Sequence, residues 1–417
     1  MRIFKFGGAS VKDAAGVKNV YDVLQKVGFE DVMLVVSAMG KTTNGLELVV
    51  KRYFEKSPDL SHAIREVKEY HHKIMLDLFE TEENMVFNAV NKHFSDIDTI
   101  LNINKSPNYD FVYDEIVSMG EIISTTILSH YFSFRGMENN WVDVRNLIKT
   151  DTTYRDAIVD WKQTEKLIAS TINQNVLNIT QGFIGSDPNF FTTTLGREGS
   201  DYTAAIFAYC LNAESVTIWK DVPGVLNADP RYFNETTLLN QISYREAIEL
   251  AFYGASVIHP KTLQPLQNKE IPLYVKSFIN PLLPGTKVSK GQDLEPAISC
   301  FIVKKDQKLI SFASRDFSFI MEENISEIFN HLSRFKIKVS LIQNTAISFE
   351  ICVEDKFDKV DELYEILNEK FNVVITNHVD LYTIRHFNQA AIDQVAADKN
   401  ILVKQVSKET VQLVAQS

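Results

Sequence analysis

The chain has 417 residues, of which 45% are hydrophobic and 23% are charged, and its net charge is -11. Because this length exceeds what one hydrophobic core usually supports, we expect two or three globular domains rather than a small module, a fibrous repeat or a disordered chain. The acidic balance disfavours a nucleic acid or a membrane surface as the main partner, although it leaves room for an anionic ligand in one basic pocket.

The number of cysteines and the hydropathy of the chain indicate its cellular location. The three cysteines, Cys210, Cys300 and Cys352, lie far apart, so the sequence predicts neither a disulfide framework nor a cysteine-based zinc site. The first residues, MRIFKFGG, interrupt a short apolar run with a lysine, which is unlike a signal peptide. No apolar run approaches the roughly 18 residues of a membrane span. We therefore expect a cytoplasmic protein.

The first two-thirds of the chain alternates β-branched runs with helical patterns. The run RIFKF precedes a helix predicted from about Ala14 to Val27, and DVMLVVSA follows it. This alternation is typical of parallel βαβ units, so we expect an α/β sheet covered by helices. Between about residues 45 and 110, apolar residues at three-to-four spacing predict a helical lid. The alternation resumes with EIISTTILSHYF (helix), VLNITQGFIG (strand), DYTAAIFAYCLN (helix) and SVTIWKDV (strand).

The last third has a different pattern after the punctuated segment NPLLPGTKVSKGQD, which predicts a domain boundary. The segments KLISFAS, ENISEIFNHLSRF, KVSLIQN, AISFEICVE, DKVDELYEILNEK and FNVVIT follow in the order βαββαβ, which is a ferredoxin-like plait. A shorter copy over LYTIRHF, QAAIDQVAAD, ILVKQVS and TVQLVAQ ends without a last helix and strand. We predict domains over 1–290 and 300–377, and a partial second plait over 378–417.

Two glycine-rich turns are candidates for binding phosphate. Common signatures are missing, since MGKTT has Val35 where a P-loop needs glycine and no G-x-G-x-x-G occurs. In KFGGASV, however, Lys5 ends a strand, and Gly7 and Gly8 present backbone N–H groups. Taken alone, this segment is either a phosphate cradle or an ordinary corner between a strand and a helix.

The second turn, TTTLGREGSDYTAA, carries Arg197, Ser200 and Asp201 at a helix start. Such a start suits an anion, although by itself a simple helix cap at Ser200 or Asp201 is the more common case. A third loop, WKDVPGVLNADPR, leaves a strand with Asp221 and ends at Arg231; by itself it is only a turn.

Together with VSAMGKTTN, SMGE, TQGFIG and YGASVIHP, these segments closely resemble the amino-acid kinase superfamily and, within it, the aspartate kinases, over nearly the whole chain. The resemblance implies a three-layer α/β/α, carbamate kinase-like domain followed by ACT regulatory plaits. It also implies transfer of the γ-phosphoryl group of ATP to the β-carboxylate of L-aspartate, the first step of a pathway to lysine, threonine and methionine.

The resemblance further implies residue roles. Lys5 would neutralise the transferring phosphoryl group, and Asp201 would orient Lys5 and the phosphates. Both residues are therefore implied as catalytic. The implied substrate-binding residues are Ser37, Ala38, Thr43, Glu121, Arg197 and Ser200, with Arg197 on the α-carboxylate and Glu121 on the α-ammonium. The implied ATP-binding residues are Lys5, Gly7, Gly8, Asp221, Val225, Arg231 and Lys261. Magnesium would arrive with the ATP phosphates, so no protein residue is implied as a metal ligand.

The chemistry of this reaction agrees with these residue types. An aspartate side chain has a pKa of about 3.9, so the nucleophile is already ionised at neutral pH and needs no general base. The obstacle is repulsion between the carboxylate and the triphosphate, which fixed cations and N–H dipoles must offset.

The sequence departs from the family pattern at several positions. Glu198 and Ser256 stand where the family usually has Gly and Lys, and Lys220 replaces a Thr. We hypothesise that Lys220 or Lys261 restores positive charge near the nucleotide. Ser340 stands where lysine-regulated members carry Asp, so lysine, threonine or no effector at all stays open. The ACT regions predict a homodimer.

Other interpretations remain. The chain could be another amino-acid kinase, such as an acetylglutamate or glutamate 5-kinase, or a non-catalytic amino-acid sensor of the same fold. Because the sequence ends without a dinucleotide-binding domain, we expect no fusion to a homoserine dehydrogenase. His71 and His72 are predicted to lie on a solvated face of the helical lid rather than to bind metal.

Overall fold

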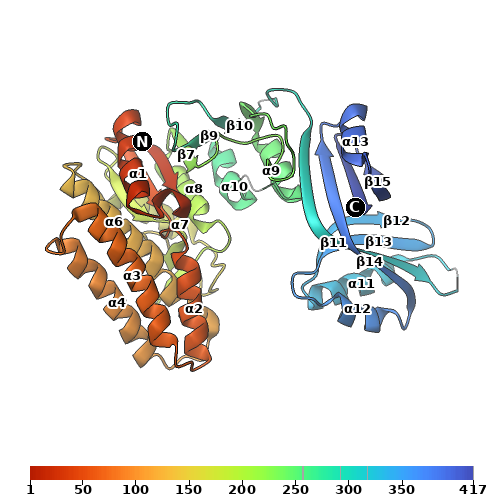
Figure 1. Cartoon of the computed structure of the whole chain (residues 1–417), viewed down its shortest axis with the longest axis horizontal. Coiled ribbons are helices and arrows are strands. Elements are labelled where there is room, and N and C mark those ends of the chain that lie inside the picture. Colours follow the sequence, from red (N-terminus) through yellow and green to blue (C-terminus); the bar gives the residue numbers. More distant parts are fainter. Residues whose placement is uncertain (256–257, 292, 317, 417) are drawn as a thin grey trace. The chain divides into compact units, whose positions relative to one another are not determined.

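The computed structural model describes residues 1–255, 258–291, 293–316 and 318–416, so Ser256, which the sequence singles out, lies outside the described residues. The chain divides into two compact units (Figure 1). The first consists of Met1–Val225, Leu238–Ile248 and Val257–Glu295, and the second of Leu226–Thr237, Glu249–Ser256 and Pro296–Ser417.

The first unit is built on an eight-stranded mixed sheet, which confirms the predicted α/β architecture. Neighbouring strands are parallel except for β9 and β10, which pair antiparallel. In spatial order the strands are β3 (Asn140–Val142), β4 (Asn178–Gln181), β2 (Val32–Val36), β1 (Arg2–Phe6), β7 (Ser215–Lys220), β9 (Leu273–Ser277), β10 (Thr286–Ser289) and β8 (Gln241–Ser243).

The central strands are apolar because both of their faces are covered. Every residue of β2 is buried, and helix α8 (Gly199–Leu211) packs against β1, β2 and β7. Continuous apolar runs of this kind are typical of parallel strands inside an α/β sheet. As in other open α/β sheets, the loops that follow the carboxyl ends of these strands are where a ligand is expected.

Helices account for most of the rest of the first unit (Figure 1). The predicted helix over Ala14–Val27 is α1, with Asp13 as its N-cap and Gly28, at φ +84°, closing it. The remaining helical segments are η1 (Gly8–Val11), α2 (Thr42–Phe54), α3 (Leu60–Phe79), α4 (Met85–Ile103), α5 (Tyr109–Val117), α6 (Met119–Phe134), η2 (Val144–Asn146), α7 (Trp161–Thr171), α9 (Tyr244–Tyr253), which continues into the second unit, and α10 (Pro260–Lys269).

The prediction that His71 lies on a solvated face is wrong. Its ring is fully buried, with Nδ1 2.7 Å from Val67 O and Nε2 3.2 Å from Thr42 Oγ1. Burial lowers the pKa of His71 to about 4, so the ring is neutral at physiological pH. The histidine therefore connects α3 to the start of α2, a tertiary contact that helical periodicity alone does not reveal. His72 is partly exposed and lies 3.2 Å from Glu82.

The second unit contains a six-stranded antiparallel sheet and three helices. Its strands, in spatial order, are β12 (Lys338–Asn344), β13 (Ser348–Glu354), β11 (Cys300–Ser314), β14 (Phe371–Arg385), β16 (Thr410–Gln416) and β15 (Asn400–Val406). Its helices are α11 (Glu322–Arg334), α12 (Val360–Leu367) and α13 (Gln389–Ala396). This arrangement is consistent with the predicted ACT plaits.

The two plaits share strands rather than follow one another. Strand β14 continues through residue 378, and its second half pairs with Cys300–Lys304, the first part of β11. The second plait, whose own segment was predicted to lack a last helix and strand, thus takes a strand from β11, which contributes to both plaits. Local sequence pattern misses this pairing because the two segments are far apart in the chain.

Candidate active site

The loops that follow four parallel strands carry the candidate residues. Strand β1 leads into Gly7, β2 into Ser37, β4 into Gly182 and β7 into Asp221. Since β4, β2, β1 and β7 are adjacent and parallel, these loops lie along one edge of the sheet. The backbone joins them directly: Ser37 N donates to Phe6 O (3.1 Å), and Gly182 N donates to Val36 O (2.9 Å).

Lys5 and Asp201 form an ion pair at this edge. Lys5 Nζ lies 2.6 Å from Asp201 Oδ1, and only 12% and 6% of the two side chains are exposed. The lysine lies near the end of β1 and the aspartate lies in the first turn of α8, which packs on that strand. Each charge offsets the cost of burying the other, so the ammonium is held in one place.

The two glycines let the Gly7–Gly8 backbone lie close to this ammonium and to the turn after β2. A Cβ atom at Gly7 would lie 3.3 Å from Lys5 Nζ, and one at Gly8 would lie 2.7 Å from Ala38 O. Gly40 N donates to Gly8 O (3.0 Å), so the turns after β1 and β2 are in direct contact. Backbone that is free of side chains beside a fixed lysine suits phosphate oxygens.

Glu121 is a buried carboxylate with spare binding capacity. Its side chain is 3% exposed, and Oε1 accepts a hydrogen bond from Ala38 N (3.3 Å). Within the described residues, Oε2 has no hydrogen-bond partner. Burial raises the pKa of Glu121 to about 8, against the opposing effects of the Ala38 N–H group and the Lys5 charge. A ligand cation at Oε2 would satisfy this oxygen and stabilise the charged form.

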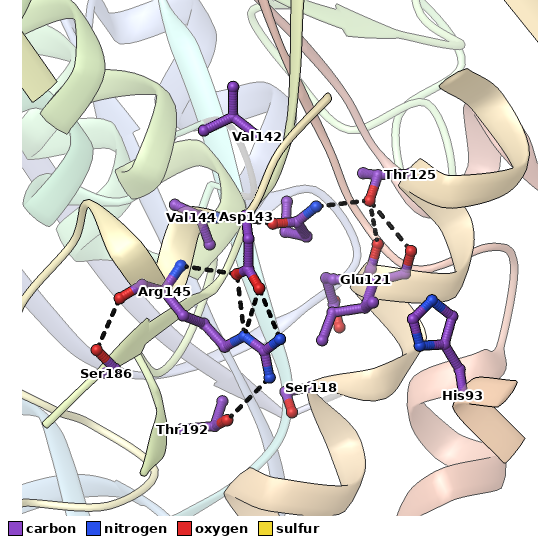
Figure 2. Close-up of polar contacts among 12 residues, drawn as sticks. His93, Ser118, Glu121, Thr125, Val142, Asp143, Val144, Arg145, Ser186 and Thr192 are labelled. Carbon is purple, nitrogen blue, oxygen red and sulfur yellow. Dashed lines mark hydrogen bonds and ion pairs between the residues drawn. The ribbon is translucent and has the colours of Figure 1, made fainter. Parts of the chain in front are cut away.

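Helix α6, which carries Glu121, is held to the sheet by a polar chain (Figure 2). Thr125 Oγ1 donates to Glu121 O (3.0 Å) and accepts from Gln181 Nε2 (2.8 Å), while Gln181 Oε1 accepts from Val144 N (2.8 Å). This chain joins α6, β4 and η2. Sequence reasoning missed these residues, although Gln181 lies within the TQGFIG motif.

A neighbouring ion pair holds the segment that follows β3. Figure 2 shows the Arg145 guanidinium beside the Asp143 carboxylate, with Nη2 2.6 Å from Oδ2. Arg145 Nη1 also reaches Thr192 Oγ1 (3.5 Å), on the hairpin of β5 (Ile184–Ser186) and β6 (Thr192–Thr194). The pair therefore connects η2 to the hairpin that leads into the Arg197 loop.

The predicted strand VLNITQGFIG is interrupted at Gly182 and Phe183. A Cβ atom at Gly182 would lie 2.5 Å from Ser200 Oγ, and Phe183 has φ +73° with its N–H donating to Thr203 Oγ1 (3.0 Å). Glycine is needed here because buried Ser200, at the start of α8, fills the space. The break thus brings the β4 loop against α8.

Asp114 holds the strand that leads into the Arg197 loop. Its carboxylate accepts from Thr194 N (2.8 Å), Thr194 Oγ1 (2.8 Å) and Arg155 N (2.9 Å). Burial outweighs these bonds and raises the pKa of Asp114 to about 6. Sequence reasoning missed Asp114, because an acidic residue in a helix has no distinctive local signal.

The structure brings most of the predicted aspartate-binding residues to this edge. Ser37 is half-buried and its carbonyl accepts from Ser124 Oγ (2.8 Å). Ala38 is buried, and Thr43 is half-buried in the first turn of α2. Arg197 is exposed on the loop between β6 and α8.

The predicted nucleotide-binding residues are more dispersed. Asp221 is exposed just after β7, and Val225 is buried with its N–H donating to Thr286 Oγ1 (2.8 Å). Lys261, in the first turn of α10, forms an ion pair with Asp156. Arg231 belongs to the second unit, where its guanidinium pairs with Asp229.

Glu198, which stands where the family usually has glycine, makes a side-chain contact within the first unit. It is half-buried, adopts φ +54°, and its Oε2 accepts a hydrogen bond from His259 N (2.9 Å).

In the part of the chain that the structure describes, no group of three His, Cys, Asp or Glu side chains is placed to hold a metal ion. Among the same residues, no helix is both long and apolar enough to cross a membrane.

Comparison with known proteins gives consistent matches. Residues 1–277 match the model of the amino acid kinase family. Lysine-sensitive aspartokinase 3 of Escherichia coli is 31% identical over 365 residues, which are 84% of this chain and 78% of that protein. A chloroplastic bifunctional aspartokinase/homoserine dehydrogenase 2 of Arabidopsis thaliana is 28% identical over 89% of this chain, but the match spans only 42% of that longer protein.

Solved structures agree over the full length. Escherichia coli aspartokinase III in complex with lysine and aspartate, in its T-state, superimposes with a TM-score of 0.85 at 27% identity, covering 99% of this chain and 95% of that one. The R-state of the same enzyme, with aspartate and ADP, gives a TM-score of 0.81 at 27% identity, covering 100% and 96%.

Proposed function

Because the chain belongs to the amino-acid kinase family and, within it, to the aspartokinases, we propose that it transfers the γ-phosphoryl group of ATP to the β-carboxylate of L-aspartate. The products are 4-phospho-L-aspartate and ADP. The observation that carries this proposal is the Lys5–Asp201 ion pair beside the Gly7–Gly8 turn. It places a fixed cation next to backbone without side chains, where a phosphoryl group needs positive charge and N–H donors.

The phosphoryl donor would be held by the end of β1. The Gly7 and Gly8 N–H groups contact phosphate oxygens, and Lys5 neutralises the charge on the group in transfer. Asp201 keeps the ammonium in place through the 2.6 Å contact. The remaining nucleotide contacts come from Asp221, Val225, Arg231 and Lys261. Magnesium, carried in by the ATP phosphates, would offset part of their charge beside Lys5.

The acceptor would bind between α6 and α8. Arg197 forms a two-point contact with the α-carboxylate, for which a planar guanidinium is well suited. Glu121 receives the α-ammonium at Oε2, the buried oxygen that otherwise has no partner in the described residues. Ser37, Ala38, Thr43 and Ser200 line the space for the side chain. No general base is required, because the attacking carboxylate is already ionised.

The first test is formation of aspartyl hydroxamate with purified protein, Mg²⁺ and ATP. Aspartate, glutamate and acetylglutamate are titrated as acceptors, each with and without lysine and threonine. We expect turnover with aspartate alone. Turnover with glutamate or acetylglutamate instead would identify another amino-acid kinase, and binding without turnover would favour an amino-acid sensor.

Regulation and assembly form a second part of the proposal. We propose a cytoplasmic enzyme with a catalytic domain over 1–290 and ACT plaits over 300–377 and 378–417, the second completed by Cys300–Lys304. Ser340 Oγ accepts from Lys304 Nζ (3.1 Å), so this position offers no carboxylate to an effector ammonium. Lysine and threonine are both retained as effectors for the hydroxamate test.

The edge strands β12 and β15 would pair between two chains to form a homodimer. Sedimentation equilibrium tests this, since each chain has a mass of 47.5 kDa. A mass that stays at one chain over the micromolar range would contradict it.

A further inference from the structure

Glu198 has a backbone conformation that normally favours glycine. It sits at φ +54° and ψ +30°, immediately before α8, and its carbonyl accepts from Asp201 N (3.0 Å) and Tyr202 N (3.1 Å). A side chain in this left-handed region is unfavourable. The adjacent contact from Glu198 Oε2 to His259 N (2.9 Å) offsets that strain.

His259 is the N-cap of α10, so Glu198 places a carboxylate at the start of that helix. A negative charge is stabilised there by the helix dipole. The hydrogen bond is charge-assisted, which makes it stronger than a bond between neutral groups. This hydrogen bond joins the loop before α8 to the start of α10.

A second carboxylate reinforces the same connection. Asp156 forms an ion pair with Lys261, in the first turn of α10, and its Oδ1 lies beside Gly196, 2.4 Å from where a Cβ atom at that position would be. The first turn of α10 is therefore bonded to the 196–201 loop by Glu198, and Asp156, the partner of Lys261, packs beside Gly196 in the same loop. All of these residues belong to the first unit.

We propose that Glu198 is a positioning residue that couples the binding of the two substrates. This rests on the proposed function, in which Arg197 and Ser200 serve the aspartate end and Lys261 the nucleotide end. The bond from Glu198 to His259 forms only when the loop and α10 are correctly placed. A ligand that orders one element therefore lowers the cost of ordering the other, so each substrate binds more tightly in the presence of its partner.

The first measurement is the dissociation constant of aspartate, by titration calorimetry, with and without Mg²⁺ and a non-hydrolysable ATP analogue. We expect the analogue to tighten aspartate binding by about fivefold or more in the unaltered chain. Glu198→Gly keeps the backbone conformation but removes the bond, so the ratio should fall close to one. Glu198→Gln retains an oxygen acceptor and should restore most of the ratio.

Glu270→Gly is the matched control. Glu270 is also a glutamate with positive φ (+57°), but it lies at the other end of α10 and pairs with Lys290. It should leave the coupling ratio unchanged. An unchanged ratio in Glu198→Gly, or an equal loss in Glu270→Gly, overturns the role of Glu198 while leaving the proposed function intact.

Hydrogen exchange on the ligand-free protein gives a readout that needs no turnover. Glu198→Gly should speed amide exchange in residues 258–263, whereas Glu270→Gly should speed it only near the end of α10. Exchange in 258–263 that matches the unaltered chain overturns the proposal. Failure of aspartate to bind the unaltered chain, in contrast, overturns the proposed function itself.

Discussion

Lys5 and Glu121 are both largely removed from water, but their partners differ. Lys5 is compensated by Asp201 at 2.6 Å, whereas Glu121 has one oxygen bonded to Ala38 N and one without a partner in the described structure. The Lys5 ammonium is already stabilised by its ion pair in the ligand-free protein. The ionised form of Glu121 lacks a partner for one oxygen and is stabilised only when a ligand supplies one. The two residues therefore lead to different predictions.

Replacing Lys5 by Met should abolish most phosphoryl transfer. Loss of one fixed charge at a developing anion typically lowers kcat by about 10²–10³-fold. The measurement is the hydroxamate rate at saturating ATP, with circular dichroism to verify folding because Asp201 is left unpaired. Lys26→Met, on the last turn of α1, is the control for loss of a lysine. A Lys5→Met rate within tenfold of the unaltered chain would refute the catalytic role.

Glu121 should make the stability of the ligand-free protein depend on pH. Its pKa is about 8 in the folded chain against an ordinary 4.5, so folding favours the protonated form. Its contribution to stability is thus complete below pH 4.5 and is lost as the pH rises through 8. Glu121→Gln stays neutral, so its free energy of unfolding should exceed that of the unaltered chain by a margin that widens between about pH 4.5 and pH 8, reaching on the order of a few kcal/mol, and its melting temperature should rise in parallel.

Calorimetry over that pH range provides the measurement. Added aspartate should narrow the margin at pH 8, because the ligand ammonium stabilises the ionised carboxylate. Parallel pH profiles for the two proteins would contradict the burial argument. Glu165→Gln, a partly exposed glutamate on α7, is the control for the loss of one carboxylate.

At the scale of elements, the site depends on how α5, α6 and the β5–β6 hairpin are fastened to the sheet. Thr125 and Gln181 connect α6 with β4, and Asp114 connects α5 with β6. These contacts hold the segments that carry Glu121 and lead into Arg197. They are side-chain bonds between elements distant in sequence, so their loss should alter substrate affinity as well as stability.

Asp114→Ala should destabilise the first unit by about 2–3 kcal/mol, since it leaves the buried N–H and hydroxyl groups of Thr194 without their acceptor. The Michaelis constant for aspartate should rise, because β6 leads into the Arg197 loop. Asp110→Ala is the matched control on the same helix: Asp110 is 53% exposed and pairs with Arg155, so its loss should cost less than about 1 kcal/mol. Equal effects of the two changes on thermal unfolding would refute the role of Asp114 in connecting α5 to β6.

At the scale of the molecule, the two units have separate cores. The first is centred on buried strands such as β2, and the second on clusters that include Leu341, Leu381 and Val403. Strands β12, β14 and β15 contribute these three residues, so one apolar cluster spans both plaits. The two plaits should therefore unfold together in one transition. The first unit should unfold in a separate transition.

Scanning calorimetry should resolve two transitions. Leu381→Ala should lower the transition of the second unit, and Leu34→Ala that of the first, each by about 2–5 kcal/mol of stability. Aspartate with a non-hydrolysable ATP analogue should raise mainly the first transition, because the proposed aspartate pocket lies there. A single transition displaced equally by both substitutions would contradict two separate cores.

Much of this organisation was predictable from local signals. Helix α1, strand β1 and the glycine turn follow from periodicity, capping residues and glycine content, which act over a few neighbouring positions. The predicted site residues do lie at one edge of the sheet: Lys5 near the end of β1, and Ala38, Glu121, Ser200 and Asp201 in a loop or in helices beside it. Asp114 and Gln181 were not predictable, because their roles depend on partners that are distant in the chain.

The sequence by itself therefore determined the family, the order of elements and the residue types available for phosphoryl transfer, because motifs and hydrophobic periods are local properties. Only the tertiary structure decided that His71 is buried, that Glu198 bonds to His259, and that β11 serves both plaits. It also raised the pKa of Glu121 to about 8. Each of these depends on burial or on contacts between distant segments, which exist only once the chain has folded.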